Sequence, residues 1–575
     1  MTKLVAKKIE FEKRGIDFFS AYNSEEAKQI IKQESDLAVI IMDVAMETAD
    51  AGLILTEYIR EELKEWVKNN PNDDGEEYDI YTDGLKIYTT INPRMQYYAE
   101  EAVARHMSYL QKAFNEQNNI KNGTIWKDFN NLLELAIKQT DRWKKMKAED
   151  IDEREIRKSF DEPINMRIFA YNKNRFIDTT MSPLDSLKYH KQILQTGFLA
   201  VDPFTGEVKA WVGGVDFKTF KYDHVNQNTK RQVGSTMKPL LYSLAIEKAG
   251  FTPFSIVQDQ QQSFDGYGMV PNTPKSCTGL SMPMGQALAE SRNCASGFIM
   301  KQINPKGNEA AKEFVDYLKK CNIQTEIPAY PSIALGSAEI SLFEMVQAYT
   351  MFPGGGYNAQ PFFINRIEDK NGNVLESFSP QRRKVINEVT AYSVVNMMQG
   401  VISKGTGRSM YSFGINAQSI AGKTGTTNDN SDLWFMGYTP QILAGAWVGA
   451  DDRYIRFTDN YFGQGAHGAL PIWAYFMAKV ANDPACNLDP NASFVKPAGM
   501  GDLNVNFVGQ DTIATDIPLE TDDIKAESDY ILPDQTNTNN SNVPQPTSNT
   551  PNNTKKPNAN KEAQKPKAIL PKKKG

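Results

Sequence analysis

Cysteine and histidine are scarce in this sequence, with four of each among 575 residues. The cysteines form no CxxC pair and have no metal-ligand spacing, and the histidines are scattered along the chain. These residues are Cys277, Cys294, Cys321, Cys486, His106, His190, His224 and His467. We therefore predict no metal site built from these residues. A Ser–His–Asp triad is also disfavoured, because the chain contains so few histidines.

Long hydrophobic runs are also missing. No stretch approaches the roughly 18 consecutive apolar residues that cross a bilayer, and residues 37–42 form one of the longest apolar runs. The N-terminus is basic but lacks the apolar core of a secretory signal. We expect neither a membrane span nor a signal peptide in this chain. The net charge is only −6, without a long basic stripe before the tail, which argues against a nucleic-acid partner.

Strand-like and helical patterns alternate through the middle of the chain. Residues 197–203 and 206–214 resemble two strands joined by a tight turn, and residues 433–438 and 442–448 form a similar pair. Helical patterns lie between these pairs, at residues 239–249, 284–290, 309–321 and 342–351. This order predicts an α+β fold over residues 191–490, with an antiparallel sheet backed by a helical cluster.

The segments on either side of this domain have a different composition. Residues 53–190 are charged and mostly helical in pattern, with one strand-like run at 85–91, and we interpret them as a linker or accessory region. Residues 491–534 form a C-terminal extension. Asn, Pro, Thr and Lys dominate residues 535–575, which predicts a disordered tail. Its basic end could touch an anionic wall or membrane surface, although a solubilising role is favoured.

Three short motifs follow one another: Ser235-Thr236-Met237-Lys238, then Ser291-Arg292-Asn293, then Lys423-Thr424-Gly425-Thr426. A serine hydroxyl is a weak nucleophile unless a base lies within hydrogen-bond reach. If a helix begins near Ser235, Lys238 lies one turn along on the same face. Burial beside other cations lowers the pKa of a lysine, so that Lys238 can accept a proton. The helix N-terminus also favours negative charge developing at Ser235.

The third motif is predicted to be an edge strand that borders a cleft. Lys423 supplies positive potential, and Gly425 lets a substrate backbone lie close to the strand. N–H groups on the strand edge could form an oxyanion hole together with the Ser235 amide. The hydroxyls of Thr424 and Thr426 could bind a terminal carboxylate.

The three motifs differ in how specific they are. Each of them is weak alone, but their order and their GSTMKP and AGKTGTTNDN contexts make chance a poor explanation. Ser291-Arg292-Asn293 is the least distinctive, because it could be only a helix cap.

Residues 84 to about 455 resemble the linker and transpeptidase portion of class A penicillin-binding proteins. The stretches that carry the resemblance are GLKIYTTINPRMQ, TMSPLDSLKYHKQILQTGFLAVDPFTGEVKAWVGG, RQVGSTMKP, ALAESRNCAS, IALGSAEISLFEMVQAYTMFPGGG, KGTGR and AGKTGTTNDNSDLWFMGYTP. The resemblance implies the penicillin-binding and serine β-lactamase-like transpeptidase fold. Members of this class also carry a membrane anchor and a glycosyltransferase domain upstream, and we expect neither in this chain.

The resemblance also implies a role for each matching residue. Ser235 would be the acyl-enzyme nucleophile and Lys238 its proton acceptor. Ser291 would relay protons to the leaving group, and Asn293 would hold the substrate peptide amide. Lys423 would help to bind the substrate carboxylate.

The remaining implied contacts come from the third motif. Thr424 and Thr426 would bind the carboxylate, and the amides of Thr426 and Ser235 would form the oxyanion hole. The substrates would be D-Ala-D-Ala stem peptides of peptidoglycan, β-lactams would acylate Ser235, and no cofactor would be needed. The resemblance implies work on the periplasmic face of the inner membrane, with other cell-wall synthesis proteins as possible partners.

Residues 1–52 resemble part of a response-regulator receiver domain. Asp43 stands at the phosphoacceptor position, but the acidic pair after a first strand and the later switch strands are lacking. Such a half receiver should bind Mg²⁺ poorly. The two resemblances meet near residues 56–63, and our hypothesis is a fusion or assembly join there, with no functional receiver.

The sequence alone leaves three alternative functions open. A serine β-lactamase shares the three motifs but needs a carboxylate to activate the deacylating water, for which Glu309 is a possible but unsupported candidate. A β-lactam-sensing or non-catalytic binding module would be acylated without crosslinking or trimming peptides. A signalling protein that acts through the receiver-like fragment is the alternative that we favour least. We favour the transpeptidase and keep carboxypeptidase activity open as a second reaction of the same site.

Overall fold

The computed structural model describes residues 39–40, 51–72, 74–304, 306–427 and 429–501. Asp43 and the predicted tail at 535–575 lie outside the described residues. The centre is a five-stranded antiparallel sheet of order β17-β18-β19-β5-β6. Its strands are β17 (Ala421–Thr426), β18 (Asp432–Tyr438), β19 (Leu443–Gly449), β5 (Gln195–Val201) and β6 (Val208–Val212). The predicted α+β class with an antiparallel sheet is confirmed.

The sheet is buried on both faces. Side chains alternate along a strand, so Leu199 and Val201 point into one hydrophobic core while Phe198 and Ala200 point into the other. This explains why the strand sequences are almost continuously apolar and do not alternate with polar residues. Every residue of β5, β18 and β19 is buried.

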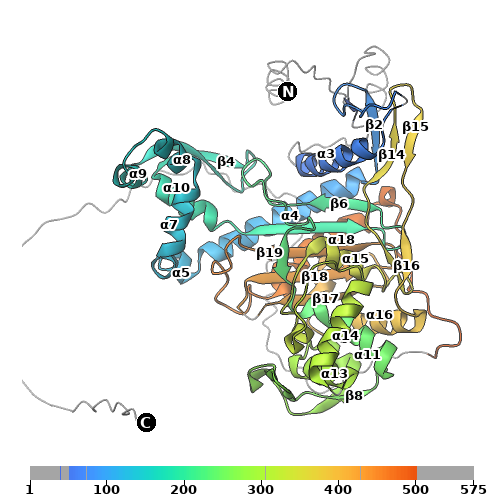
Figure 1. Cartoon of the computed structure of the whole chain (residues 1–575). Helices are drawn as coiled ribbons and strands as arrows, with labels where there is room; N and C mark the ends of the chain where they lie inside the picture. Colours follow the sequence, from blue (N-terminus) through green and yellow to red (C-terminus); the bar gives the residue numbers. More distant parts are fainter. Residues whose placement is uncertain (1–38, 41–50, 73, 305, 428, 502–575) are drawn as a thin grey trace, which may run out of the picture. The chain divides into compact units, whose positions relative to one another are not determined.

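Helices α4 (Pro93–Asn115) and α18 (Leu470–Val480) cover one face of the sheet and pack against each other (Figure 1). The Asn92 side chain caps α4 by accepting from the amides of Arg94 and Met95, and Pro93 occupies the first turn. The buried face of α4 follows a helical period. It includes Met95, Ala99, Ala102, Val103, His106, Leu110 and Phe114.

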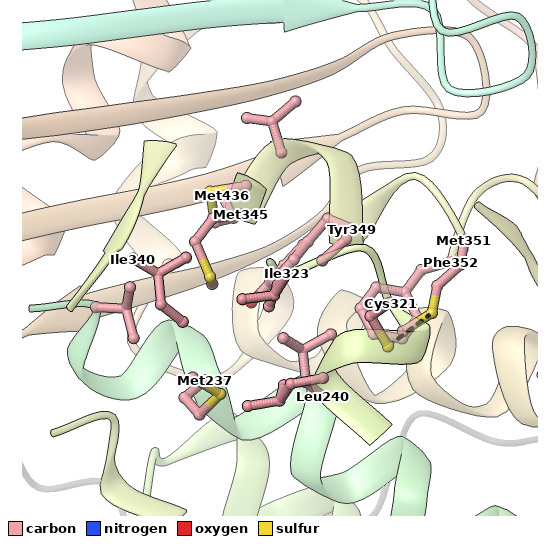
Figure 2. Close-up of a cluster of buried hydrophobic side chains, with 14 of the residues drawn as sticks. Met237, Leu240, Cys321, Ile323, Ile340, Met345, Tyr349, Met351, Phe352 and Met436 are labelled. Atoms are coloured by element: carbon pink, nitrogen blue, oxygen red, sulfur yellow. Dashed lines mark hydrogen bonds between the residues drawn. The ribbon is translucent and has the colours of Figure 1, made fainter. Parts of the chain in front are cut away.

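A helical lobe lies on the other face of the sheet (Figure 1). Its helices are α11 (Lys238–Ala249), α12 (Met284–Ala289), α13 (Asn293–Ile303), α14 (Gly307–Lys320), α15 (Leu342–Tyr349) and α16 (Glu388–Ser403). Figure 2 shows Met237 and Leu240 gathered with Ile340, Met345 and Met436 in one buried cluster. The start of α11 is therefore anchored in the core.

The region before this domain contains more strand than the sequence pattern indicated. Helix α3 (Ala51–Asn69) contacts β6, and strand β2 (Leu85–Thr89) pairs with β14 (Ile364–Glu368). Short helices follow, from α5 (Asn118–Lys121) to α10 (Pro183–Lys191).

Strands β3 (Ile164–Phe169) and β4 (Phe176–Met181) form an antiparallel hairpin that the mostly helical expectation missed. Much of this hairpin is exposed, so its sequence lacks a clear apolar period. Among the described residues, no helix is long and apolar enough to cross a bilayer.

Two glycines allow a close backbone contact in the loop before α11. Gly336 has φ 81°, and a Cβ built there would lie 1.7 Å from the carbonyl oxygen of Gly234, which itself has φ 53°. The Gly234 amide donates to the Gly336 carbonyl at 3.0 Å. Only glycine fits both the left-handed backbone and the space at position 336.

We predict that Gly336→Ala destabilises the fold by clearly more than Gly250→Ala. Gly250 also has positive φ, 68°, but a Cβ there meets nothing within 4 Å. Gly250→Ala should cost about 1–2 kcal/mol from backbone strain alone, and Gly336→Ala should cost more because main-chain atoms must move. Urea unfolding of both variants measures this difference, and equal midpoints would contradict the prediction.

Candidate active site

Ser235 lies in a 3₁₀ turn, η1 (Gly234–Met237), that runs directly into α11. The sequence had suggested an α-helical start, but a 3₁₀ turn has three residues per turn, which aligns residues i and i+3 more directly. Ser235 and Lys238, three residues apart, therefore lie on the same side of this turn. Ser235 is partly exposed, and its hydroxyl has no hydrogen-bond partner within the described part of the chain.

The side chains of Lys238 and Lys423 meet at Ser291, so the three motifs come together. The Lys238 Nζ donates to the Ser291 carbonyl, lies 3.3 Å from the Ser291 Oγ, and donates to the Asn293 Oδ1 at 2.8 Å. The Lys423 Nζ donates to the same Ser291 Oγ at 2.9 Å and to the Thr424 carbonyl at 2.9 Å. A single hydroxyl thus links two lysines from different elements.

Both lysines are completely buried, and this changes their protonation. Burial, with repulsion from Lys423 and Arg292 added, lowers the pKa of Lys238 well below its ordinary value, although Asp259 acts in the opposite direction. Burial lowers the pKa of Lys423 to about 7. A neutral amine is consequently available in this site near neutral pH.

Ser291 has an unusual backbone. Its φ is 58°, in the left-handed region that residues with a side chain seldom adopt. It turns the chain between α12 and α13, and its amide donates to the Leu288 carbonyl at 3.0 Å. This turn directs both the carbonyl and the hydroxyl of Ser291 at the lysines. Strained residues of this kind are frequent at functional sites.

Strand β17 is the edge of the large sheet and packs against η1. A Cβ on Gly425 would lie 2.8 Å from the Thr236 Cγ2 and 3.0 Å from the Val233 carbonyl oxygen. A Cβ on Gly234 would lie 2.7 Å from the Thr426 carbonyl oxygen. The glycine at 425 is thus required by the approach of η1, a constraint that the sequence interpretation did not include.

The two threonines of the third motif have different neighbours. The Thr424 Oγ1 shares a hydrogen bond of 2.7 Å with the Thr406 Oγ1. The Thr426 Oγ1 accepts from the Gly465 amide at 3.0 Å, which leaves the proton of this hydroxyl to donate. Thr406 and Gly465 were not predicted as site residues. Thr406 lies in the KGTGR stretch, which was the only signal for it.

Acidic residues close to the motifs, and Glu309 on α14, are engaged in other contacts. Glu290 forms an ion pair with Arg292 at 2.8 Å, and Asp259 accepts from the backbone amides of Thr278 and Ala295. Glu309, the candidate for activating water, is about half exposed and pairs with Lys312 at 3.0 Å. None of these contacts leaves a carboxylate aimed at Ser235.

Comparison with known families identifies the two parts of this chain. The family model of the penicillin-binding protein middle domain matches residues 117–194, and that of the penicillin binding protein transpeptidase domain matches residues 196–449. The chain belongs to the penicillin-binding protein family. Its central sheet and helical lobe are thus those of a transpeptidase domain.

The curated relatives of this chain are longer than the chain itself. Penicillin-binding protein 1A of Pseudomonas aeruginosa is 30% identical over 369 residues, which are 55% of this chain and 43% of the relative. Penicillin-binding protein 1A of Neisseria gonorrhoeae is 29% identical over 485 residues, which are 74% of this chain and 55% of the relative. The chain spans about half the length of these relatives.

Solved structures share the fold of this penicillin-binding protein. Penicillin-binding protein 1A from Haemophilus influenzae has a TM-score of 0.57 at 19% identity, covering 83% of this chain and 75% of that one. The PonA1 protein from Mycobacterium tuberculosis in complex with penicillin V has a TM-score of 0.50 at 21% identity, covering 78% and 96%.

The lowered pKa of Lys423 predicts a pH-dependent stability. The unfolded chain keeps this lysine charged up to its ordinary pKa of 10.5, whereas the folded protein releases the proton near 7. Between these values the unfolded state binds more protons, so the free energy of unfolding rises with pH. From about pH 7 to about pH 9, the protein should gain about 2 kcal/mol relative to Lys423→Met.

Urea unfolding at both pH values measures this gain. Lys479→Met is the matched control, because Lys479 is an exposed lysine on α18 that pairs with Glu101. This control should show the same pH dependence as the unchanged protein. A parallel pH dependence in Lys423→Met would contradict the prediction.

Proposed function

We propose that this protein is a peptidoglycan D,D-transpeptidase that crosslinks D-Ala-D-Ala stem peptides through an acyl-Ser235 intermediate. The observation that carries the proposal is the convergence of two buried lysines on the Ser291 hydroxyl, with Ser235 one 3₁₀ turn from Lys238. This arrangement supplies a neutral amine as the base and a hydroxyl that can pass a proton on.

In the first step, neutral Lys238 takes the proton of the Ser235 hydroxyl, and the Oγ attacks the carbonyl carbon of the penultimate D-Ala. The resulting oxyanion would be bound by the amides of Ser235 and Thr426, because β17 lies against η1. Ser291 would pass the proton to the nitrogen of the leaving D-Ala. The acyl group then remains on Ser235 as an ester.

In the second step, an acceptor amine from another stem peptide attacks the ester, and the proton returns along the same groups. Lys423 and the hydroxyls of Thr424 and Thr426 would bind the substrate carboxylate. The Asn293 Oδ1 is occupied by Lys238, so its amide NH₂ would donate to the substrate peptide. A β-lactam would acylate Ser235 by the same first step, and its ring-opened product stays attached.

Hydrolysis of β-lactams is the main alternative, since a serine β-lactamase uses the same three motifs. The contacts of Glu290 and Glu309 disfavour it. Glu290 pairs with Arg292, Glu309 lies about half exposed at the start of α14 beside Lys312, and neither contacts Ser235 among the described residues. Rapid turnover of penicillin would support the hydrolase. Stable acylation without any transfer or trimming of peptides would support a sensing module.

The proposed site of action is the periplasmic face of the bacterial inner membrane, where other cell-wall synthesis proteins would be partners. The disulfide between Cys277 and Cys294 supports this location, because disulfides persist in oxidising compartments. Residues 53–190 and 191–490 would act as accessory region and transpeptidase domain.

We predict that Ser235→Ala abolishes covalent labelling by a fluorescent penicillin, since the acyl-accepting oxygen is removed. Ser412→Ala, which changes a surface hydroxyl with a local hydrogen bond, should label normally. Gel fluorescence and intact mass measure the adduct. Undiminished labelling of Ser235→Ala would show that the nucleophile lies elsewhere.

We predict that Lys238→Arg also reduces acylation, by about 10²–10⁴-fold, the usual contribution of general base catalysis. Arginine keeps a positive charge but does not release its proton in proteins, so the variant separates charge from basicity. Lys248→Arg on the same helix is the control, because Lys248 is exposed and pairs with Glu313. A normal acylation rate in Lys238→Arg would exclude Lys238 as the base.

A further inference from the structure

We propose that the Cys277–Cys294 disulfide and Asp259 form a positioning device for the active site. Together they fix the first turn of α13, so that Asn293 stays in contact with Lys238. This inference rests on the proposed acyl transfer at Ser235 and assigns a role to residues that touch no substrate.

The disulfide joins an exposed loop to the buried start of a helix. Cys277 is partly exposed and lies in the loop before β11 (Ser281–Pro283), whereas Cys294 is fully buried in the first turn of α13. The two Cα atoms are 5.6 Å apart, across 17 residues of sequence. Cys294 directly follows Asn293, so a displacement of one moves the other.

Asp259 compensates for a missing helix cap. Arg292 occupies the N-cap position of α13 but makes no side-chain cap hydrogen bond. The Asp259 Oδ1 accepts instead from the Ala295 amide at 3.2 Å, which pairs one of the free amides at a helix start. The carboxylate is fully buried and also suits the positive end of the helix.

The same carboxylate holds the loop that carries the disulfide. The Asp259 Oδ2 accepts from the amide and the hydroxyl of Thr278, at 3.0 Å and 2.9 Å. Thr278 is the residue next to Cys277. Asp259 and the disulfide therefore connect the same two segments, the loop and the start of α13, by two independent links.

These links matter because α13 and the turn before it supply the oxygen partners of Lys238. The Lys238 Nζ bonds to Asn293 and to Ser291, and all of these bonds depend on where this short segment lies. If the first turn of α13 moves, the base loses its partners and its alignment with Ser235. Small misplacements of catalytic groups lower the rate of chemistry more than the binding of substrate.

The test compares oxidised protein with protein reduced by a phosphine under native conditions. Stopped-flow acylation by a fluorescent penicillin yields the first-order acylation rate and the non-covalent binding constant separately, both normalised to titrated active sites. We expect reduction to lower the acylation rate about tenfold and to leave the binding constant almost unchanged, as for a misplaced catalytic group. Normalisation removes any effect of unfolded molecules.

Two variants complete the design. Cys277→Ala/Cys294→Ala should match the reduced protein and should not respond to the phosphine. Asp259→Ala should slow acylation with the disulfide intact, while Asp152→Ala, which removes the cap of helix α9 (Glu153–Ser159), should not. If the acylation rates of oxidised and reduced protein differ by less than about twofold, the positioning role is overturned, because a misplaced catalytic group would lower the rate far more. If the oxidised protein is not acylated at all, the proposed function itself fails.

Discussion

The burial of two lysines around one serine hydroxyl is the constraint on which the site depends. Lys238 and Lys423 are both shielded from water, and each lies within hydrogen-bond reach of the Ser291 Oγ. Burial and mutual repulsion disfavour the state in which both are charged. The protonation of the two amines is therefore a property of the pair, with the hydroxyl between them as the connection.

The fold supplies each member of this group from a different element. Lys423 comes from the edge strand of the large sheet, Lys238 from the helix that follows the 3₁₀ turn, and Ser291 from the left-handed turn between α12 and α13. Because the sheet is buried on both faces, the edge strand cannot shift without disturbing two cores. Glycines at the contacts allow the loops to approach the strand closely enough for the lysines to meet.

Much of this arrangement could be predicted from the sequence. The apolar runs at 197–203, 433–438 and 442–448 correspond to β5, β18 and β19, and the four predicted helical stretches overlap α11, α12, α14 and α15. The hairpin of β3 and β4 could not be predicted from apolar runs, because much of it is exposed. Its two strands are held by pairing with each other and bury no continuous apolar face. The disulfide was also missed, since a separation of 17 residues follows no recognised cysteine pattern.

By itself, the sequence determined most strands and helices of the central domain and which chemical groups stand in the three motifs, because these depend on neighbours a few residues away. Only the tertiary structure decided that Lys238 contacts Ser291 and Asn293, that Thr424 contacts Thr406, and that Cys277 pairs with Cys294. The hydrogen bond from Lys423 to Ser291 crosses 132 positions of sequence. Contacts over such distances arise from the packing of whole elements, and no local pattern encodes them.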